Sequence, residues 1–314
     1  MRNPVTVCTT VTESEYEKIM FSNVLVTRKR NIVWGRNWRT IDFQFFVTFV
    51  LVHLLALFAP FTFDWNVLVF VFFKWAMNGI GLTLSYHRNL AHHSLKLPKW
   101  LEYLFAYFGV LAFQWDPISW VSVHRLHHKY VDSEKDTHSP TFGFWYSHAG
   151  WLFDSAYIIE KFQETNNVDD LKNQVFYRFI QRTYILHLFA HVCLIYAYGG
   201  FSYIVWVVGV MTTWSYHVTF LVNSACHVWG TQKWDTGDLS KNNWWVALLT
   251  FGEGWHNNHH AFEYSARHGL EFWQFDLSWY IIRFLEALGL ATNVKLPTEA
   301  HKLKKSFTSH NKFK

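Results

Sequence analysis

Long apolar runs constrain this chain more than any other feature of its sequence. Residues 41–60 form one such run with a single charged side chain, and residues 66–86 form a second of similar length. About 20 predominantly apolar residues are enough to cross the hydrocarbon core of a bilayer as a helix. We therefore predict that both runs are membrane-spanning helices.

Two further apolar runs follow a polar middle segment. Residues 183–198 are short but strongly apolar, and Gly199–Gly200 separates them from residues 201–222. Residues 101–113 are too short to span a bilayer and have polar flanks, so we expect a helix that lies in the interface or re-enters the membrane. The runs 41–60, 66–86, 183–198 and 201–222 together predict an all-α membrane protein with four transmembrane helices.

Basic residues predict how these spans are oriented. Arginines and lysines gather before residue 40 and in residues 87–182, whereas the connections 61–65 and 199–200 carry none. Positive residues favour the cytosolic side, which places both termini and the middle segment in the cytosol. We predict one domain over residues 1–314, made of an N-terminal segment (1–40), the spans (41–60, 66–86, 183–198, 201–222), a cytosolic helical cap (87–182, 223–295) and a basic tail (296–314).

Composition excludes several classes of protein. Hydrophobic residues make up 51% and charged residues 16% of the chain, against about 25% charged in an ordinary soluble domain, so the chain is neither disordered nor a charged coiled coil. The net charge of +5 comes from scattered basic residues, and we expect no nucleic-acid partner. Cys8, Cys193 and Cys226 form no C-x-x-C pair, which argues against disulfides and cysteine-bound zinc.

Histidine is the unusual residue, with 19 copies that are strongly clustered. Residues three and four apart share one face of a helix, so clustered imidazoles can be aimed at one point. Asn223 and His227 show the same spacing of four at the end of the fourth run. The three main groups are His87 with His92; His124 with His127 and His128; and His256 with His259 and His260.

These groups predict a two-metal centre on the cytosolic side. An imidazole-rich site suits iron, zinc, copper or nickel. In a membrane protein such a centre favours oxidative chemistry on a lipid-soluble substrate, because no side chain alone can take hydrogen from an unactivated C–H bond. Metal-bound imidazoles need acceptors for their other N–H group, and we expect Asp132, Asp136 and Glu253 to supply them. Arg88 and Arg125, inside the groups, either bind an anion or brace the chain.

The histidine segments also carry a family resemblance. SYHRNLAHHS, SWVSVHRLHHKYVDSEKDTHSP, NSACHVWG and GEGWHNNHHAFEYSARHG resemble segments of the membrane fatty acyl desaturases, in particular the plant acyl-CoA and acyl-lipid Δ9-type branch. The resemblance covers roughly residues 35–295. It implies two Fe²⁺ ions held by His87, His92, His124, His127, His128, His227, His256, His259 and His260, with Asn223 acting through a water.

The resemblance further implies an activity and partners. Family members use O₂ to remove two hydrogens from adjacent methylenes, giving a cis double bond, with electrons from cytochrome b5 and its reductase. On this basis we expect a desaturase of the endoplasmic reticulum membrane. The family's kinked acyl tunnel would be lined here by Trp75, Gly79, Gln114, Trp115, Trp120, Thr219 and Phe220, with Trp75 closing its far end.

The sequence leaves alternatives open. A di-iron hydroxylase would share the histidine groups, and a non-enzymatic histidine-rich metal transporter would use similar ligands near the middle of the membrane. At Trp115 and Phe220 the chain departs from residues that relatives carry. The choice between acyl-CoA and glycerolipid substrate, the chain length and the double-bond position are therefore not predicted.

Overall fold

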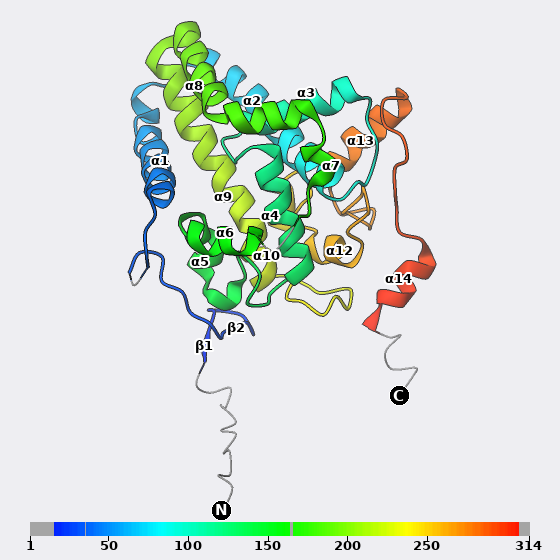
Figure 1. The fold of residues 1–314 in the computed structure, drawn as a ribbon. Coiled ribbons are helices and arrows are strands. Elements are labelled where there is room, and N and C mark those ends of the chain that lie inside the picture. The colour runs from blue at the N-terminus through cyan, green and yellow to red at the C-terminus, as the bar shows by residue number, and fades with distance from the viewer. Residues whose placement is uncertain (1–15, 35, 164–165, 308–314) are drawn as a thin grey trace, which may run out of the picture.

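A computed structural model describes residues 16–34, 36–163 and 166–307 (Figure 1). Cys8 and the last residues of the basic tail lie outside this part. The described chain is mostly helical, and its strands β1 (Glu17–Lys18) and β2 (Leu25–Val26) form a small antiparallel pair.

Three helices are long and apolar enough to cross a membrane in the described part of the chain. The first covers Thr40–Phe61 and contains α1 (Thr40–Ala56) and the 3₁₀ turn η2 (Ala59–Phe61). The second, Trp65–Ala91, joins α2 (Trp65–Gly79) to the π-helical η3 (Ile80–Ala91). The second helix continues past the predicted end at residue 86, so that His87 is still helical.

The third apolar helix, Val175–Val228, is 54 residues long. A straight helix of that length would measure about 80 Å, more than twice the thickness of a bilayer core. Gly200 interrupts it with φ +66° and ψ −152°, values that glycine adopts without steric cost. It comprises α8 (Val175–Tyr203), the π-helical η6 (Ile204–Val210), α9 (Met211–Asn223) and α10 (Ala225–Val228).

The chain doubles back at this interruption. Tyr184, before Gly200, accepts a hydrogen bond from the Trp115 backbone N–H at 3.0 Å, and Tyr216, after it, donates to the Phe113 carbonyl at 2.9 Å. Both halves of the long helix therefore reach the same loop. The two halves correspond to the predicted runs 183–198 and 201–222.

Large apolar side chains remain exposed on the outer faces of the long helices. Leu51 on α1 is 58% exposed, Phe73 on α2 is 61% exposed and Phe189 on α8 is 68% exposed. A soluble chain rarely leaves so many large apolar groups in contiguous contact with water. These faces are suited to lipid, in agreement with a membrane protein.

The short run 101–113 gives α3 (Lys99–Val110), which packs against η3. Gly81 and Gly109 allow this close approach, because a Cβ on Gly81 would overlap the backbone of Gly109. Leu82, Tyr86 and Leu90 of η3 form one buried cluster with Ala106 and with residues of α4. The helix that carries the first histidine is thus fixed from two sides.

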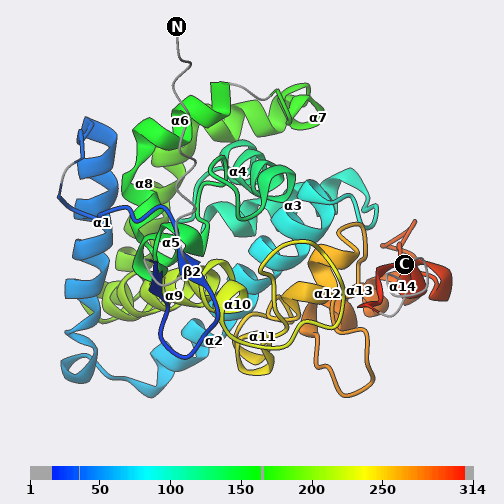
Figure 2. The ribbon, with the colours of Figure 1, turned by 90° about the horizontal axis from the view of Figure 1, so that it is seen from below.

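The remaining helices are short, and most of them lie in the segments 87–182 and 223–295 that carry the predicted cap, whereas α14 lies in the predicted tail. Figures 1 and 2 show α4, α10 and α12 near the middle of the molecule, with α1 at one edge and α14 at the other. The bounds are α4 (Pro117–Tyr130), η4 (Pro140–Phe142), α5 (Phe144–His148), η5 (Gly150–Phe153), α6 (Ser155–Gln163), α7 (Asp169–Lys172), α11 (Trp244–Leu249), α12 (His256–Ala261), α13 (Leu277–Ala287) and α14 (Glu299–Lys305).

Candidate metal centre and acyl cavity

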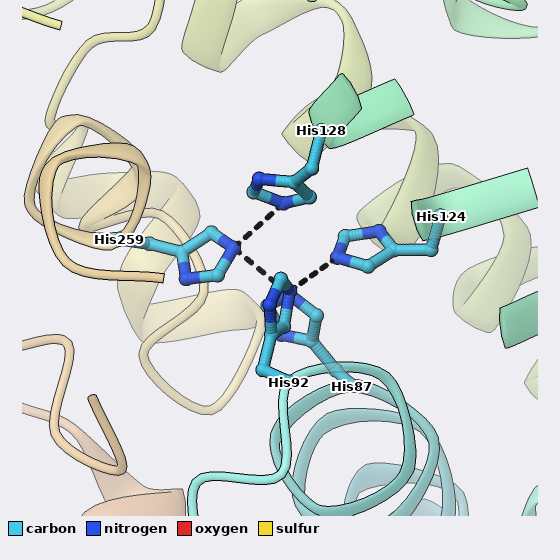
Figure 3. A group of neighbouring side chains, drawn as sticks. All are labelled: His87, His92, His124, His128 and His259. Carbon is cyan, nitrogen blue, oxygen red and sulfur yellow. Dashed lines mark hydrogen bonds between the residues drawn. The ribbon is translucent and has the colours of Figure 1, made fainter. Parts of the chain in front are cut away.

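Five of the predicted ligands form one cluster (Figure 3). Their ligand atoms all lie within 4.8 Å of one another, and the cluster consists of His87, His92, His124, His128 and His259. The Nε2 atoms of His92 and His124 are 2.7 Å apart. The Nε2 atom of His259 lies 3.1 Å from that of His87 and 3.0 Å from that of His128. Imidazoles from three separate segments therefore point at one centre.

The other four predicted histidines form a second, fully buried cluster of His127, His227, His256 and His260. The Nε2 atoms of His227 and His256 are 3.0 Å apart. The Nε2 atoms of His127 and His260 are buried and have no hydrogen-bond partner among the described residues. Buried polar atoms normally have partners, so this cluster lacks one at its centre.

Helical spacing distributes the histidines between the two clusters. α4 starts at Pro117 behind the capping residue Asp116, whose Oδ1 accepts from the backbone N–H groups of Ile118 and Ser119. On α4, His124 and His128 are four residues apart and both belong to the first cluster, whereas His127 belongs to the second. In α12, His259 joins the first cluster, and His256 and His260, again four apart, join the second.

The protonation state of these groups fits metal binding. Removal from solvent, followed by the neighbouring imidazoles, holds the pKa values of five of these histidines well below the ordinary value, so these five are neutral near pH 7. The groups concerned are His92, His124, His256, His259 and His260. Neutral imidazoles whose unprotonated nitrogens converge repel one another unless a cation lies between them. Two imidazole-rich groups of this kind fit two transition-metal ions.

The three predicted carboxylates contact these imidazoles from outside. The Nδ1 atom of His127 donates to Asp136 at 3.0 Å, and that of His227 donates to Asp132 at 3.2 Å. The Nδ1 atom of His87 lies 2.5 Å from Glu253 Oε2. A donor at Nδ1 leaves the Nε2 lone pair free for a metal, so the carboxylates select the tautomer that ligation requires.

Two further carboxylates lie beside imidazoles of the clusters and were not predicted from the sequence. Asp238 accepts from His260 Nδ1 at 3.0 Å, and Glu263 Oε1 lies 3.3 Å from His128 Nδ1. Asp238 stands in the loop between α10 and α11, and Glu263 follows α12 but contacts α4. Metal-bound imidazoles generally need an acceptor, so further carboxylates could be expected from the sequence. No spacing rule identifies which carboxylates these are.

Arg88 braces the centre. It is fully buried, and its Nη2 lies 2.9 Å from both Glu253 Oε1 and Asp276 Oδ1. Burial alone would raise the pKa of Glu253, but Arg88, His268 and His87 together hold it well below its ordinary value. Arg125 bonds the carbonyl of Ala91, at the end of η3, at 3.1 Å, and also reaches Asp170 at 2.8 Å. Of the two interpretations from sequence, the contacts of both arginines favour bracing.

Two apolar cavities meet beside the clusters. The first is lined by Trp75, Gly79 and His256, among others, and the second by Gln114, Trp115 and Phe220. Trp120, His124, Thr219 and Asn223 line both. The seven predicted tunnel residues therefore all line these two cavities, and Asn223 is one of the four residues that the cavities share.

Trp75 lies at the α2 side of the first cavity, about three turns before His87. Its ring is 4.6 Å from that of Phe251, and the Phe251 ring occupies the space that a Cβ on Gly79 would need. Trp75 and Phe251 together form the wall at this side.

Replacing Asp136 with asparagine should weaken metal retention roughly 10- to 100-fold, because His127 then loses the carboxylate that fixes its tautomer. The measurement is the rate of metal loss to a chelator from the purified protein. Glu134→Gln is the matched control, since Glu134 is exposed two residues away. Equal rates of metal loss from the two variants would contradict this role of Asp136.

Comparison with known proteins agrees with the geometry of this site. The family model described as fatty acid desaturase matches residues 65–293. The chain is 56% identical over 311 residues to the palmitoyl-monogalactosyldiacylglycerol delta-7 desaturase, chloroplastic, of Arabidopsis thaliana, which covers 98% of this chain and 84% of that protein.

Two other relatives are similar over nearly their whole length. The delta-9 acyl-lipid desaturase 1 of Arabidopsis thaliana is 51% identical over 92% of this chain and 95% of its own. The acyl-CoA 5-desaturase AL21 of Anemone leveillei is 53% identical over 94% of this chain and 92% of its own.

The chain belongs to the fatty acid desaturase family. It is a fatty acyl desaturase that acts on acyl-lipid or acyl-CoA substrates. The resemblance read from the histidine segments is thereby confirmed, and the desaturase interpretation is favoured over the hydroxylase and the transporter.

Proposed function

We propose that the two histidine clusters hold two iron ions and that Asn223 acts on the iron centre through a water. The observation that carries this proposal is the convergence of nine imidazoles, mostly neutral and buried, in two groups beside two apolar cavities that share lining residues. When bound, the iron pair activates O₂ so that hydrogen can be taken from an unactivated C–H bond. The neighbouring carboxylates hold His87, His127, His227 and His260 in the tautomer that binds metal.

In this proposal the acyl chain lies in the two cavities. It enters through the second cavity, between the cap and α1, bends at Trp120 and Thr219, and ends in the first cavity at Trp75. The apolar walls exclude water from the chain, and the bend brings two adjacent methylenes beside His124 and Asn223. His124 and Asn223 line both cavities, so the carbons at the junction of the cavities would be those nearest the metal centre.

We further propose four spans, with Gly200 at the turn between the last two, and with both termini and the cap in the cytosol. The electron donors would be cytochrome b5 and its reductase, and the membrane that of the endoplasmic reticulum. The relative that is 56% identical is named as chloroplastic, which makes the chloroplast the competing location. A fluorescent fusion in leaf cells, compared with markers of both locations, distinguishes the two.

Expression in yeast that lacks its own Δ9 desaturase tests the activity and identifies the product. We expect a new monounsaturated fatty acid whose double-bond position is read by mass spectrometry of the extracted lipids. The same strain without the chain is the control. A hydroxylated acid in place of the olefin would contradict the proposed reaction. If the chain accumulates without a new product, feeding candidate plant lipids separates a missing substrate from a wrong proposal.

A further inference from the structure

The loop of residues 111–116 has an unusual backbone for its position between α3 and α4. Phe113 has φ +63° and Trp115 has φ +74°, in the left-handed region that bulky residues rarely adopt. The side chains of Phe113, Gln114 and Trp115 all line the second cavity. In a regular strand, neighbouring side chains alternate between two faces, so this backbone is what turns three consecutive side chains towards one space.

Side chains from three helices hold the loop in this conformation. Lys74 of α2, which is buried, donates to the Leu111 carbonyl at 2.6 Å. Tyr216 of α9 donates to the Phe113 carbonyl at 2.9 Å, and Tyr184 of α8 accepts from the Trp115 N–H at 3.0 Å. In an apolar environment each backbone group needs such a partner, and a strained backbone persists only where its surroundings determine it.

The centre of the loop is hydrogen-bonded to side chains near the junction of the two cavities. The Gln114 Nε2 atom donates to Thr219 Oγ1 at 3.0 Å and to Ser215 Oγ at 3.0 Å. Thr219 is one of the residues that line both cavities. The loop and α9 therefore contribute hydrogen-bonded side chains to the region where the two cavities meet.

The far end of the loop continues directly into α4, the helix that carries three of the histidines. Asp116 caps α4, and the same helix places Trp120 and His124 at the junction of the two cavities. A displacement of the loop would thus change the distance between the bend and the histidines of α4. That distance decides which carbon–carbon bond of a bound acyl chain lies beside the metal centre.

We propose that Tyr184 and Tyr216, with Lys74, are positioning residues that set the position of the new double bond by holding this loop at the bend. The proposal rests on the placement of the acyl chain described above. The rings of both tyrosines line the second cavity, and their hydroxyl groups form hydrogen bonds with the backbone of the loop. Replacing either tyrosine with phenylalanine therefore keeps the ring in the cavity wall and removes only the hydroxyl group that anchors the loop.

The test compares Tyr184→Phe, Tyr216→Phe and wild type in the desaturase-deficient yeast strain, with Tyr198→Phe as control. Tyr198 is on α8 and is 69% exposed. Protein in the membrane fraction is measured by immunoblot, and the fractions of positional isomers among the monounsaturated products by mass spectrometry. We expect one dominant isomer for wild type and Tyr198→Phe. For each anchor variant the minor isomers should rise by roughly three- to tenfold, the effect of losing one hydrogen bond.

The outcomes separate this inference from the proposed function. Lower total product with an unchanged isomer ratio in both anchor variants would overturn it, because the anchors would then serve stability only. Loss of both variants from the membrane while Tyr198→Phe accumulates would overturn it for the same reason. A wild-type chain that yields no olefin from any lipid supplied would instead contradict the proposed function.

Discussion

Replacing His127 with alanine should lower desaturation by more than about a hundredfold and reduce bound iron from two ions to about one per chain. His127 Nε2 is buried, has no partner among the described residues and points into the second cluster. Loss of the groups that merely orient a ligand already costs about 10- to 100-fold in affinity or activity, so loss of the ligand should cost more. The measurements are product yield in yeast and iron content of the purified protein.

His301→Ala is the matched control for this prediction. His301 lies on α14, is exposed and contacts Tyr264 rather than either cluster. We expect its iron content and product yield to equal those of wild type. Full iron and full activity in His127→Ala would show that the second cluster is not a metal site.

Replacing Arg88 with methionine should lower the free energy of unfolding by about 3–5 kcal/mol, because it leaves Glu253 and Asp276 buried without their counter-charge. Both carboxylates are less than one-tenth exposed. For a chain of this size the loss corresponds to a fall in the unfolding midpoint of roughly 5–10 °C. The midpoint is measured on detergent-solubilised protein.

Arg283→Met provides the comparison for Arg88→Met. The Arg283 side chain is 58% exposed and pairs with Glu286 one turn away on α13. Exposed pairs of this kind contribute little, and the change should stay within about 0.5 kcal/mol. Equal effects of the two substitutions would mean that the buried network around Arg88 is not a brace.

Much of the fold could be predicted because the long helices and their interruption are determined by short stretches of sequence. Apolar length identified the first two long helices, and Gly199–Gly200 identified the interruption in the third. The second helix runs on to Ala91, and its last part, η3, is π-helical, a geometry that composition does not reveal. This extension is what allows α3 to pack beside the first histidine group.

The candidate site could be predicted only where spacing carries the information. The i, i+3 and i, i+4 intervals located the histidines of α4 and α12, and the family resemblance completed the set with His87, His92 and His227. The structure gathers all nine into two clusters. Spacing did not show that α4 and α12 each contribute to both. The contacts of Asp238, Glu263 and Asp276 connect residues far apart in the chain, and these depend on tertiary packing. The anchors of loop 111–116 were missed for the same reason.

The metal content of the purified wild-type chain tests the central claim most directly. The protein would be expressed with iron in the medium, purified in mild detergent, and analysed by plasma mass spectrometry and by X-ray absorption at the iron edge. The account predicts two irons per chain, each surrounded mainly by imidazole nitrogen. One metal per chain or fewer in protein that forms olefin, or an iron environment of sulfur or mainly oxygen ligands, would contradict it.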